Sequence, residues 1–526
     1  MKNNIYNKTS LPYFLVLSFL LIFLTSCKKD KPSPEIDPFA IDISQKYLSN
    51  SYENNLRDSI WYYYKVLSLW QDVIPPTSQT EINKIDELGF IRNNYSQYFE
   101  TGETTLDYLM GLTKNRLPNR TPLDNYDWYS FIDRGGSVSS SIKESLSSGL
   151  GMSLFYLQTT SNEDNADLFI QFVEKNSSAY NAGLKRGDQI ISINGDTKLD
   201  YNYQKNQNFK PLLDFLKLPT ITIKTRNTNG EIEEKTLTYT TYSNSPIIVG
   251  KTIEDNSKKI GYFLFNSFYS IKNNGFYTSF YRDLEELFSK FERDGITELI
   301  IDLRNNGGGD VETAAYLANR VAPASENGKT MYSYEVNNTI KSWGWLDDGE
   351  EFAPIKFQKR GNLNLTKVYF LVSPNTASAS ELLINSLKPV ITTYMIGTYS
   401  LNDSNIEVAD KTYGKPVGFF GLPVVDDNLE LYVTSFKMYN RNGEGNYYDG
   451  LTPNANVWEY RNFQDFGHPE ETMLATALNH IQNGSFTPIS LVATNKSRGS
   501  QTGYKTKHLL NKNLNNTNSG MFKFKK

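Results

Sequence analysis

The stretch LIIDLRNNGGGDVETAAYLANRV, residues 299–321, decides the fold of this chain. It begins with an apolar run typical of a buried strand, reaches a glycine triplet at 307–309 and then takes on helical spacing. Glycine permits a turn without Cβ clashes, so a backbone N–H of the turn is able to face a substrate carbonyl oxygen. The stretch therefore predicts a strand, a turn and a helix. The turn is a candidate oxyanion site or, in the simpler interpretation, an ordinary connection.

Strand and helix patterns alternate around this unit and predict an α/β core. We expect strands at 260–266, 297–303, 367–373 and 392–397, and helices at 277–293, 310–321 and 378–388. Two later strands are expected at 416–424 and 429–437, followed by a helix from Glu470 to Gln482.

Two polar residues outside this stretch form a candidate nucleophile and base. Ser378 lies in TASASE, residues 376–381, and Lys415 lies in TYGK, residues 412–415. A lysine can take the proton of a serine when burial disfavours its ammonium form, and the residues after Lys415 are largely apolar. The usual partner is histidine, but His468, His480 and His508 all lie near the C-terminal end, outside any motif that would place them beside Ser378. We therefore expect Lys415 to be neutral near pH 7.

Each of these residues also has a structural interpretation. Ser378 and Glu381 match the S-x-x-E capping box of a helix start, and a single lysine is often a solvated surface residue. Ser380 is the second candidate nucleophile, and it should point away from the site. We interpret Asp302, Arg304 and Glu381 as structural charges. The joint occurrence of the three segments favours catalysis.

In this order the segments resemble those of the S41 peptidases, the carboxy-terminal processing proteases, whose patterns are L-R-x-N-x-G-G, S-A-S-E and T-Y-G-K. The flanking residues 260–263 and 449–454 also match, and the resemblance covers roughly residues 145–483. It implies a ClpP/crotonase-like ββα catalytic domain at 250–485. It further implies Ser378 as nucleophile, Lys415 as general base, and the backbone N–H groups of Gly308 and Ala379 as oxyanion donors. Many members have a glutamine four residues after the lysine, where this chain has Phe419.

Residues 145–240 resemble a PDZ domain. The loop Gly149-Leu150-Gly151-Met152 precedes a strand pattern at 168–173, and the stretch from Ser178 to Gly195 continues the match. Small residues in such a loop expose backbone N–H groups beside a sheet edge, where they can hold a terminal carboxylate while the peptide adds as a strand. The resemblance implies protein or peptide partners with accessible C-termini.

The N-terminus has the pattern of a lipoprotein signal peptide at residues 1–27. An apolar run from Leu11 to Leu24 is followed by Leu24-Thr25-Ser26-Cys27. By resemblance to bacterial lipoproteins, this implies cleavage before Cys27 and acylation of its thiol, which would anchor the protein in a lipid bilayer. Lys28 favours the outer membrane of a cell envelope. Cys27 is the only cysteine, so no disulfide or cysteine metal site is expected.

The remaining segments complete a multidomain α+β organisation. Residues 28–48 read as a flexible tether, residues 49–135 as an N-terminal helical domain, and residues 495–526 as a flexible, solvent-exposed tail. The 54 basic and 58 acidic residues are nearly balanced, so we expect no nucleic-acid partner. We also expect no metal and no cofactor, and the sequence leaves the oligomeric state open.

Together these patterns predict a lipid-anchored serine endopeptidase of the bacterial envelope, which recognises C-terminal tails through its PDZ domain. The alternative is a catalytically inactive PDZ scaffold that binds peptides.

Overall fold

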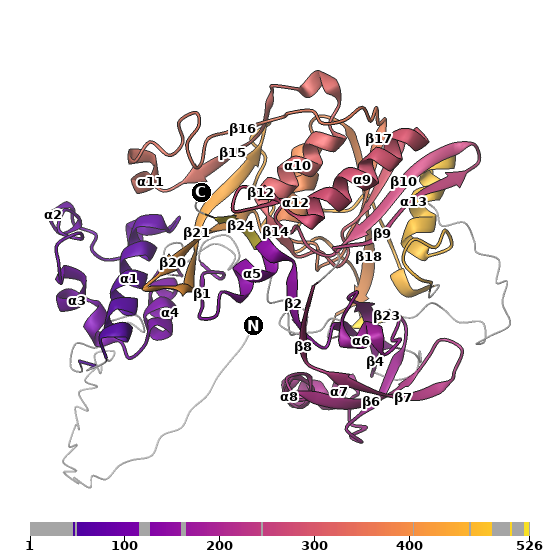
Figure 1. Cartoon of the computed structure of the whole chain (residues 1–526), viewed down its shortest axis with the longest axis horizontal. Coiled ribbons are helices and arrows are strands. Elements are labelled where there is room, and N and C mark those ends of the chain that lie inside the picture. The colour runs from indigo at the N-terminus through magenta and orange to yellow at the C-terminus, as the bar shows by residue number, and fades with distance from the viewer. Residues whose placement is uncertain are drawn as a thin grey trace, which may run out of the picture. The chain divides into compact units, whose positions relative to one another are not determined.

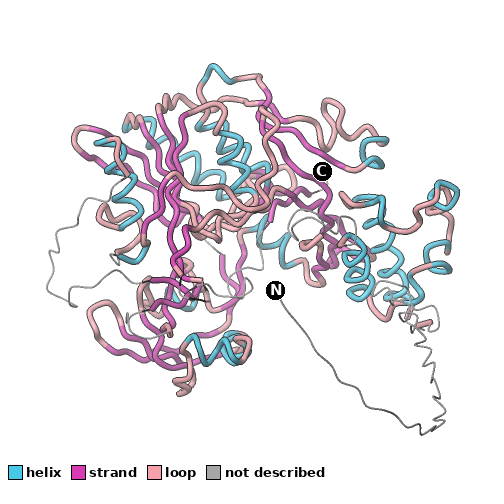
Figure 2. Tube along the Cα trace, turned by 180° about the vertical axis from the view of Figure 1, so that it is seen from behind, coloured by secondary structure: helices cyan, strands magenta, loops and turns pink. Residues whose placement is uncertain are grey.

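A computed structural model describes residues 46–47, 50–114, 127–158, 165–243, 246–402, 404, 406–461, 464–486, 505–507 and 520–524 (Figures 1 and 2). The expected signal peptide, Cys27 and most of the tether lie outside these residues. Within the described ranges, none of the helices combines the length and apolar character that a membrane span requires.

The N-terminal region is helical. Its helices are α1 (Ser51–Leu67), α2 (Gln79–Ile82), α3 (Phe90–Asn94) and α4 (Gly102–Thr113). Asn50 begins α1 by accepting a hydrogen bond from the Glu53 N–H at 2.8 Å, which satisfies one of the free donors of the first turn. The buried side chains of α1, among them Ile60 and Tyr64, face the rest of the molecule, and α1 packs on α4.

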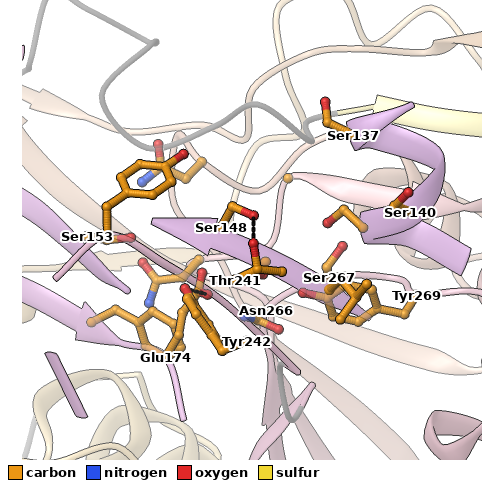
Figure 3. Close-up of a pocket in the computed structure, with 18 of the residues that line it drawn as sticks. Ser137, Ser140, Ser148, Ser153, Glu174, Thr241, Tyr242, Asn266, Ser267 and Tyr269 are labelled. Atoms are coloured by element: carbon orange, nitrogen blue, oxygen red, sulfur yellow. Dashed lines mark hydrogen bonds between the residues drawn. The ribbon is translucent and has the colours of Figure 1, made fainter. Parts of the chain in front are cut away.

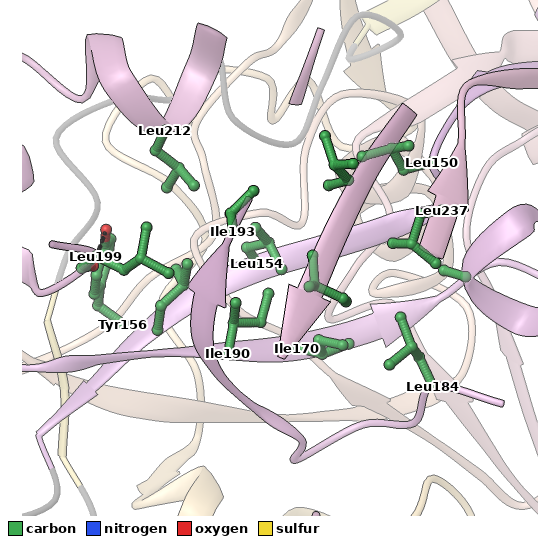
Figure 4. Close-up of a cluster of buried hydrophobic side chains, with 14 of the residues drawn as sticks. Leu150, Leu154, Tyr156, Ile170, Leu184, Ile190, Ile193, Leu199, Leu212 and Leu237 are labelled. Atoms are coloured by element: carbon green, nitrogen blue, oxygen red, sulfur yellow. Dashed lines mark hydrogen bonds between the residues drawn. The ribbon is translucent and has the colours of Figure 1, made fainter. Parts of the chain in front are cut away.

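The PDZ region follows as a sheet with short helices. Its elements are α5 (Ser137–Glu144), β2 (Leu146–Gly149), β3 (Met152–Gln158), β4 (Asp167–Val173), α6 (Ser178–Asn181), β5 (Gln189–Ile193), α7 (Tyr201–Asn206), α8 (Lys210–Leu216), β6 (Thr220–Arg226), β7 (Ile232–Thr238) and β8 (Thr240–Ser243). Inward-facing aliphatic residues of these strands and helices, such as Leu154, Ile170, Ile190 and Leu212, form one core (Figure 4).

The α/β core is built on a sheet in the order β9–β10–β13–β17–β18. Its strands are β9 (Ile247–Asp255), β10 (Lys258–Phe265), β13 (Glu298–Asp302), β17 (Lys367–Leu371) and β18 (Thr392–Leu401). From β10 to β18 the neighbours are parallel, and β9 adds antiparallel to β10. The helices are α9 (Ser279–Asp294), α10 (Val311–Val321), α12 (Ala379–Leu387) and α13 (Thr472–Asn483).

Alternation along β10 shows how the helices cover this sheet. Tyr262 and Leu264 belong to the cluster that contains Met473 of α13. Phe263, pointing the other way, packs on Phe288 of α9 with ring centres 5.8 Å apart. The two faces are therefore covered by different helices (Figure 1). The expected strand–turn–helix unit is present as β13, the glycine turn and α10.

A second sheet contains Gly308 and the strand that follows Lys415. Its order is β14 (Gly308–Asp310), β24 (Gly520–Phe524), β20 (Val417–Val424), β21 (Asp426–Asn440), β15 (Thr330–Val336) and β16 (Ile355–Lys356). The strand β1 (Phe131–Asp133), which follows the N-terminal helices, pairs antiparallel with β21. The remaining short elements are β11 (Lys272–Asn273), β12 (Phe276–Tyr277), α11 (Asn338–Ser342), β19 (Glu407–Ala409), β22 (Ala455–Val457) and β23 (Lys505–Lys507).

The prediction of a flexible, solvent-exposed tail at 495–526 is wrong for residues 520–523. Gly520–Phe524 form β24, which lies between β14 and β20, and Met521 and Phe522 are buried. The physical reason is local: Met521, Phe522 and Phe524 are apolar residues at the end of a segment whose composition is otherwise polar. Lys505–Lys507 form β23, which pairs with β3 and with β18 and so joins the PDZ sheet to the core sheet.

Candidate active site

Ser378 lies at the turn between β17 and α12, as the N-cap residue of the helix. Its backbone has φ 62° and ψ −111°, a conformation that a residue with a Cβ adopts only at a cost of about 1–3 kcal/mol. The side chain is fully buried, and its Oγ has no hydrogen-bond partner among the described residues. A strained strand-to-helix turn of this kind is a recurrent way to present a nucleophilic serine.

The carboxylate of Glu381 joins the Ser378 turn to the Lys415 segment. It accepts hydrogen bonds from the N–H of Ser378 at 2.8 Å, of Gly414 at 2.7 Å and of Lys415 at 2.8 Å. The Thr412 hydroxyl donates to the same carboxylate at 2.5 Å. Glu381 thus supplies its half of the expected capping box, whereas the Ser378 hydroxyl is not used as a cap. Burial raises the pKa of the Glu381 carboxyl, and the four donors oppose that rise.

Lys415 is held in a pocket with aromatic walls. Its Nζ lies 3.8 Å from the ring centre of Phe419 and 4.4 Å from that of Tyr129, and the residue is 3% exposed. Burial lowers the pKa of Lys415 from 10.5 to about 7, and the nearby carboxylates of Asp127 and Glu381 limit that decrease. A substantial fraction of this amine is therefore neutral near pH 7. Lys415 and Ser378 form no hydrogen bond with each other in this structure.

The two predicted oxyanion donors lie side by side. A Cβ placed on Gly308 would stand 3.0 Å from both Ala379 N and the Cβ of Ser378. Ala379 begins α12, where the N–H groups have no intrahelical partner. The N–H of Gly308 instead donates to Asn306 Oδ1 at 3.0 Å, so this group would have to exchange partners before it could bind a substrate oxygen.

Asn306 and Ser380 fasten the glycine turn to the nucleophile turn. The Asn306 carbonyl accepts hydrogen bonds from Ser380 Oγ at 2.9 Å and from Ala377 N at 3.2 Å. The hydroxyl of Ser380, the second candidate nucleophile, is therefore used to hold the two turns together.

A buried ion cluster stabilises the end of β13 just before the glycine turn. Arg304 contacts Asp302 at 2.6 Å, Glu471 at 2.8 Å and Glu459 at 3.1 Å. Arg186, from the PDZ region, reaches Glu459 at 3.2 Å. These charges connect the PDZ region with the base of the candidate site, which fits the interpretation of Asp302 and Arg304 as structural charges.

The predicted PDZ loop contains two backbone N–H groups that make no hydrogen bond to a described residue. The Leu150 carbonyl accepts a hydrogen bond from Ala179 N at 2.9 Å, while the N–H groups of Leu150 and Gly151 make no hydrogen bond to any described residue. Gly151 has φ 81°, and a Cβ there would stand 1.9 Å from the Cβ of Ser177. Met152 begins β3, whose outer edge pairs antiparallel with β23.

A polar cavity of about 540 Å³ lies between the PDZ loop region and the glycine turn (Figure 3). Hydroxyl side chains dominate its wall, and Ser148 of β2 and Thr241 of the neighbouring strand β8 hydrogen-bond each other at 2.8 Å. Gly307 of the glycine turn and Asn375, which lies three residues before Ser378, are also among its lining residues. Such a wall offers many hydrogen-bonding groups to a peptide backbone. No group of three or more His, Cys, Asp and Glu residues able to hold a metal ion occurs within the described part of the chain.

Sequence reasoning missed three contributors to this site. Asp127 and Tyr129 reach the Lys415 pocket from a segment about 290 residues earlier, and no motif marks either of them. The third is β24, for which the apolar residues Met521, Phe522 and Phe524 were an available signal.

Comparison with known proteins assigns this architecture. Residues 259–457 match the model of peptidase family S41, and residues 139–208 match the PDZ domain. The carboxyl-terminal-processing protease of Synechocystis sp. is 25% identical over 337 residues, which cover 62% of this chain and 68% of that protein. A CtpA-like serine protease of Staphylococcus aureus is 22% identical over 383 residues, covering 72% of this chain and 66% of that protein.

A solved structure supports the same fold. A crystal structure assigned to an S41 protease from Bacteroides fragilis matches with a TM-score of 0.60 and 22% identity, covering 84% of this chain and 99% of that one. Residues 259–457 are therefore similar to the peptidase domain of family S41 and residues 139–208 to a PDZ domain, and these similarities identify the chain as a serine-type peptidase with a PDZ domain.

Proposed function

We propose that the chain is an endopeptidase that uses a Ser378/Lys415 dyad and recognises the C-terminal tails of protein substrates through its PDZ domain. The observation that carries this proposal is the Glu381 carboxylate, which binds the backbone of both Ser378 and Lys415. The lysine is buried with its pKa near 7, the serine hydroxyl has no described hydrogen-bond partner, and one carboxylate binds the backbone N–H groups of both residues.

The reaction follows from these positions. Lys415 takes the proton of Ser378 Oγ as the oxygen attacks the substrate carbonyl carbon, and the N–H of Ala379 stabilises the negative charge that develops. The protonated lysine then donates to the leaving amine. Water, activated by the same lysine, hydrolyses the acyl-enzyme. The Gly308 N–H joins Ala379 as a donor once it leaves Asn306.

Substrate delivery rests on the PDZ loop and the polar cavity. The N–H groups of Leu150 and Gly151 suit a terminal carboxylate, and the edge of β3 before Tyr156, where β23 does not pair, suits an extended backbone. A tail bound there has a hydroxyl-lined route toward Gly307 and Asn375. The envelope location is part of the same proposal and depends on acylation of Cys27. It is tested by incorporation of labelled fatty acid into the parent chain but not into Cys27→Ser.

The decisive experiment is cleavage of an unstructured protein, such as casein, by a soluble form that begins at Lys28. Ser378→Ala and Lys415→Ala should each lower kcat/KM by at least about a thousandfold. Lys411→Ala is the matched control, because Lys411 is exposed and lies four residues from Lys415. Equal cleavage by the parent and both site variants would refute the dyad. A parent that binds C-terminal peptides without cleaving any protein would instead be the peptide-binding scaffold.

A further inference from the structure

The strand β24 occupies a slot that the catalytic residues border on both sides. It runs parallel to β14, which begins at the glycine turn, and to β20, which begins two residues after Lys415. In this register Gly520 pairs with Gly308, and Phe522 pairs with Phe419. Without β24, the edges of β14 and β20 would both lack a partner here. An extended peptide in such a gap binds through its main chain, which is the general mode of strand addition.

The carbonyl oxygen of Gly520 lies close to Gly308, one of the two predicted oxyanion donors. A Cβ built on Gly308 would stand 2.5 Å from Gly520 O and 3.0 Å from both Ala379 N and the Cβ of Ser378. One point in space is therefore close to the nucleophile, to the oxyanion donor and to a single carbonyl of the chain. The peptide bond that follows this carbonyl joins Gly520 to Met521.

Only glycine fits at the position beside the nucleophile. A Cβ on Gly520 would stand 2.6 Å from the Phe419 ring and 3.0 Å from the Phe522 ring. Both rings are buried and belong to one cluster, so neither can move aside easily. Phe419 thus limits the size of the residue at the reacting carbonyl.

The strand is also held at its far end and upstream. Lys523 Nζ forms an ion pair with Glu351 at 3.3 Å. Upstream, Lys505–Lys507 pair antiparallel with Tyr156–Gln158 of β3, the strand that follows the PDZ loop. The same C-terminal segment therefore uses the PDZ edge at one point and the catalytic slot at another, as a substrate tail is expected to do.

We propose that the protein is a substrate of its own active site and cleaves the Gly520–Met521 bond within the same molecule; this rests on the proposed dyad. Ser378 Oγ loses its proton to Lys415 and bonds to the carbonyl carbon of Gly520. The bond from that carbon to Met521 N breaks, and the nitrogen takes the proton. Water then hydrolyses the ester, which regenerates the Ser378 hydroxyl and leaves a carboxylate on Gly520. Until this cut, β24 keeps Ser378 buried and other peptides out of the slot.

The test follows the mass of the intact soluble protein, beginning at Lys28, during incubation at pH 8. The parent should accumulate a form that ends at Gly520, with a first-order rate independent of protein concentration. Ser378→Ala should keep its full mass, also when mixed with an equal amount of the parent. Casein cleavage is measured in the same samples. If the parent cleaves casein in a Ser378-dependent manner while the Gly520–Met521 bond stays intact, self-cleavage is refuted and the proposed function stands. If neither is cut, both proposals fail.

Two further changes test the register without touching the nucleophile. Gly520→Val should lower the rate of self-cleavage by at least about a hundredfold, because its branched side chain cannot fit beside Phe419. Lys523→Glu should slow self-cleavage, because it places a second carboxylate beside that of Glu351. The double variant Lys523→Glu/Glu351→Lys restores an ion pair with its charges exchanged and should recover most of the rate. Unchanged cleavage in Gly520→Val, or a cut at another bond in the parent, would overturn the assignment of this bond.

Discussion

The Nζ of Lys415 lies 3.8 Å from the centre of the Phe419 ring. The family pattern named in the sequence analysis has a glutamine at the position of Phe419, and here an aromatic face contacts the lysine instead. A ring attracts the cationic form, but burial disfavours it more strongly, and the net result is a lowered pKa. The base is thus positioned by packing.

The pH dependence of activity should reflect this environment. Because only the neutral amine accepts a proton, kcat/KM should rise about tenfold per pH unit below about 7 and level off above it. Phe419→Gln makes the pocket more polar, which raises the pKa of Lys415, so the rising limb should move to higher pH. Initial rates of peptide cleavage between pH 5 and 10 measure both profiles. An identical midpoint in the two proteins would argue against Lys415 as the titrating group.

Stability should depend on the same lysine with a defined sign. The folded-state pKa of about 7 is lower than the unfolded value of 10.5, so the unfolded chain binds more protons between these limits. Burial of the charged lysine therefore lowers the unfolding free energy of the parent by its full amount below pH 7. This loss of stability shrinks as the pH rises from 7 and disappears above 10.5. Lys415→Met removes the penalty. It should raise the unfolding free energy by a few kcal/mol at pH 6 and by little at pH 10, as measured by urea denaturation.

The backbone at Ser378 predicts an unusual ranking of two inactive variants. A φ of 62° with ψ of −111° is strained for alanine as well as for serine, whereas glycine adopts it freely. Ser378→Gly should therefore be more stable than Ser378→Ala by about 1 kcal/mol, although glycine loses more entropy on folding. Thermal unfolding of the two variants gives the comparison, and a lower melting temperature for Ser378→Gly would contradict the strain.

Replacing Glu381 should lower stability and activity by more than the loss of a helix cap alone would. In Glu381→Gln, one carboxylate oxygen becomes an NH₂ group that faces backbone N–H donors, so at least one buried hydrogen bond is lost at about 1–3 kcal/mol. Both stability and kcat/KM should fall. Glu312→Gln is the matched control, because Glu312 also lies in the first turn of a helix but is exposed. Similar losses in the two variants would show that Glu381 has no special role.

The sequence predicted the parts of the site that are local in the chain. The turn after β13, the start of α12 at Ser378 and the apolar surroundings of Lys415 each follow from a short pattern, and the structure has them where expected. Glu381 was predicted as a structural charge, but its bonds to residues 412–415 depend on how distant segments meet. The same holds for Tyr129 and Asp127, which no local pattern connects with Lys415.

The C-terminal segment shows a different reason for failure. Its average composition is polar, and composition averaged over thirty residues conceals a five-residue strand such as Gly520–Phe524. Short strands obtain their stability from two partners and from burial, not from their own propensity. This segment has β14 on one side and β20 on the other, two partners that lie far from it in the sequence.

The short strand β23 gives the two lobes a common hydrogen-bonded ladder, since it pairs with β3 on one side and with β18 on the other. A polypeptide held at that position connects the PDZ sheet to the core sheet through main-chain hydrogen bonds. Bound peptides of different length should therefore differ in how strongly they slow amide hydrogen exchange in β3 and β18. Tighter peptide binding should accompany slower exchange in these two strands.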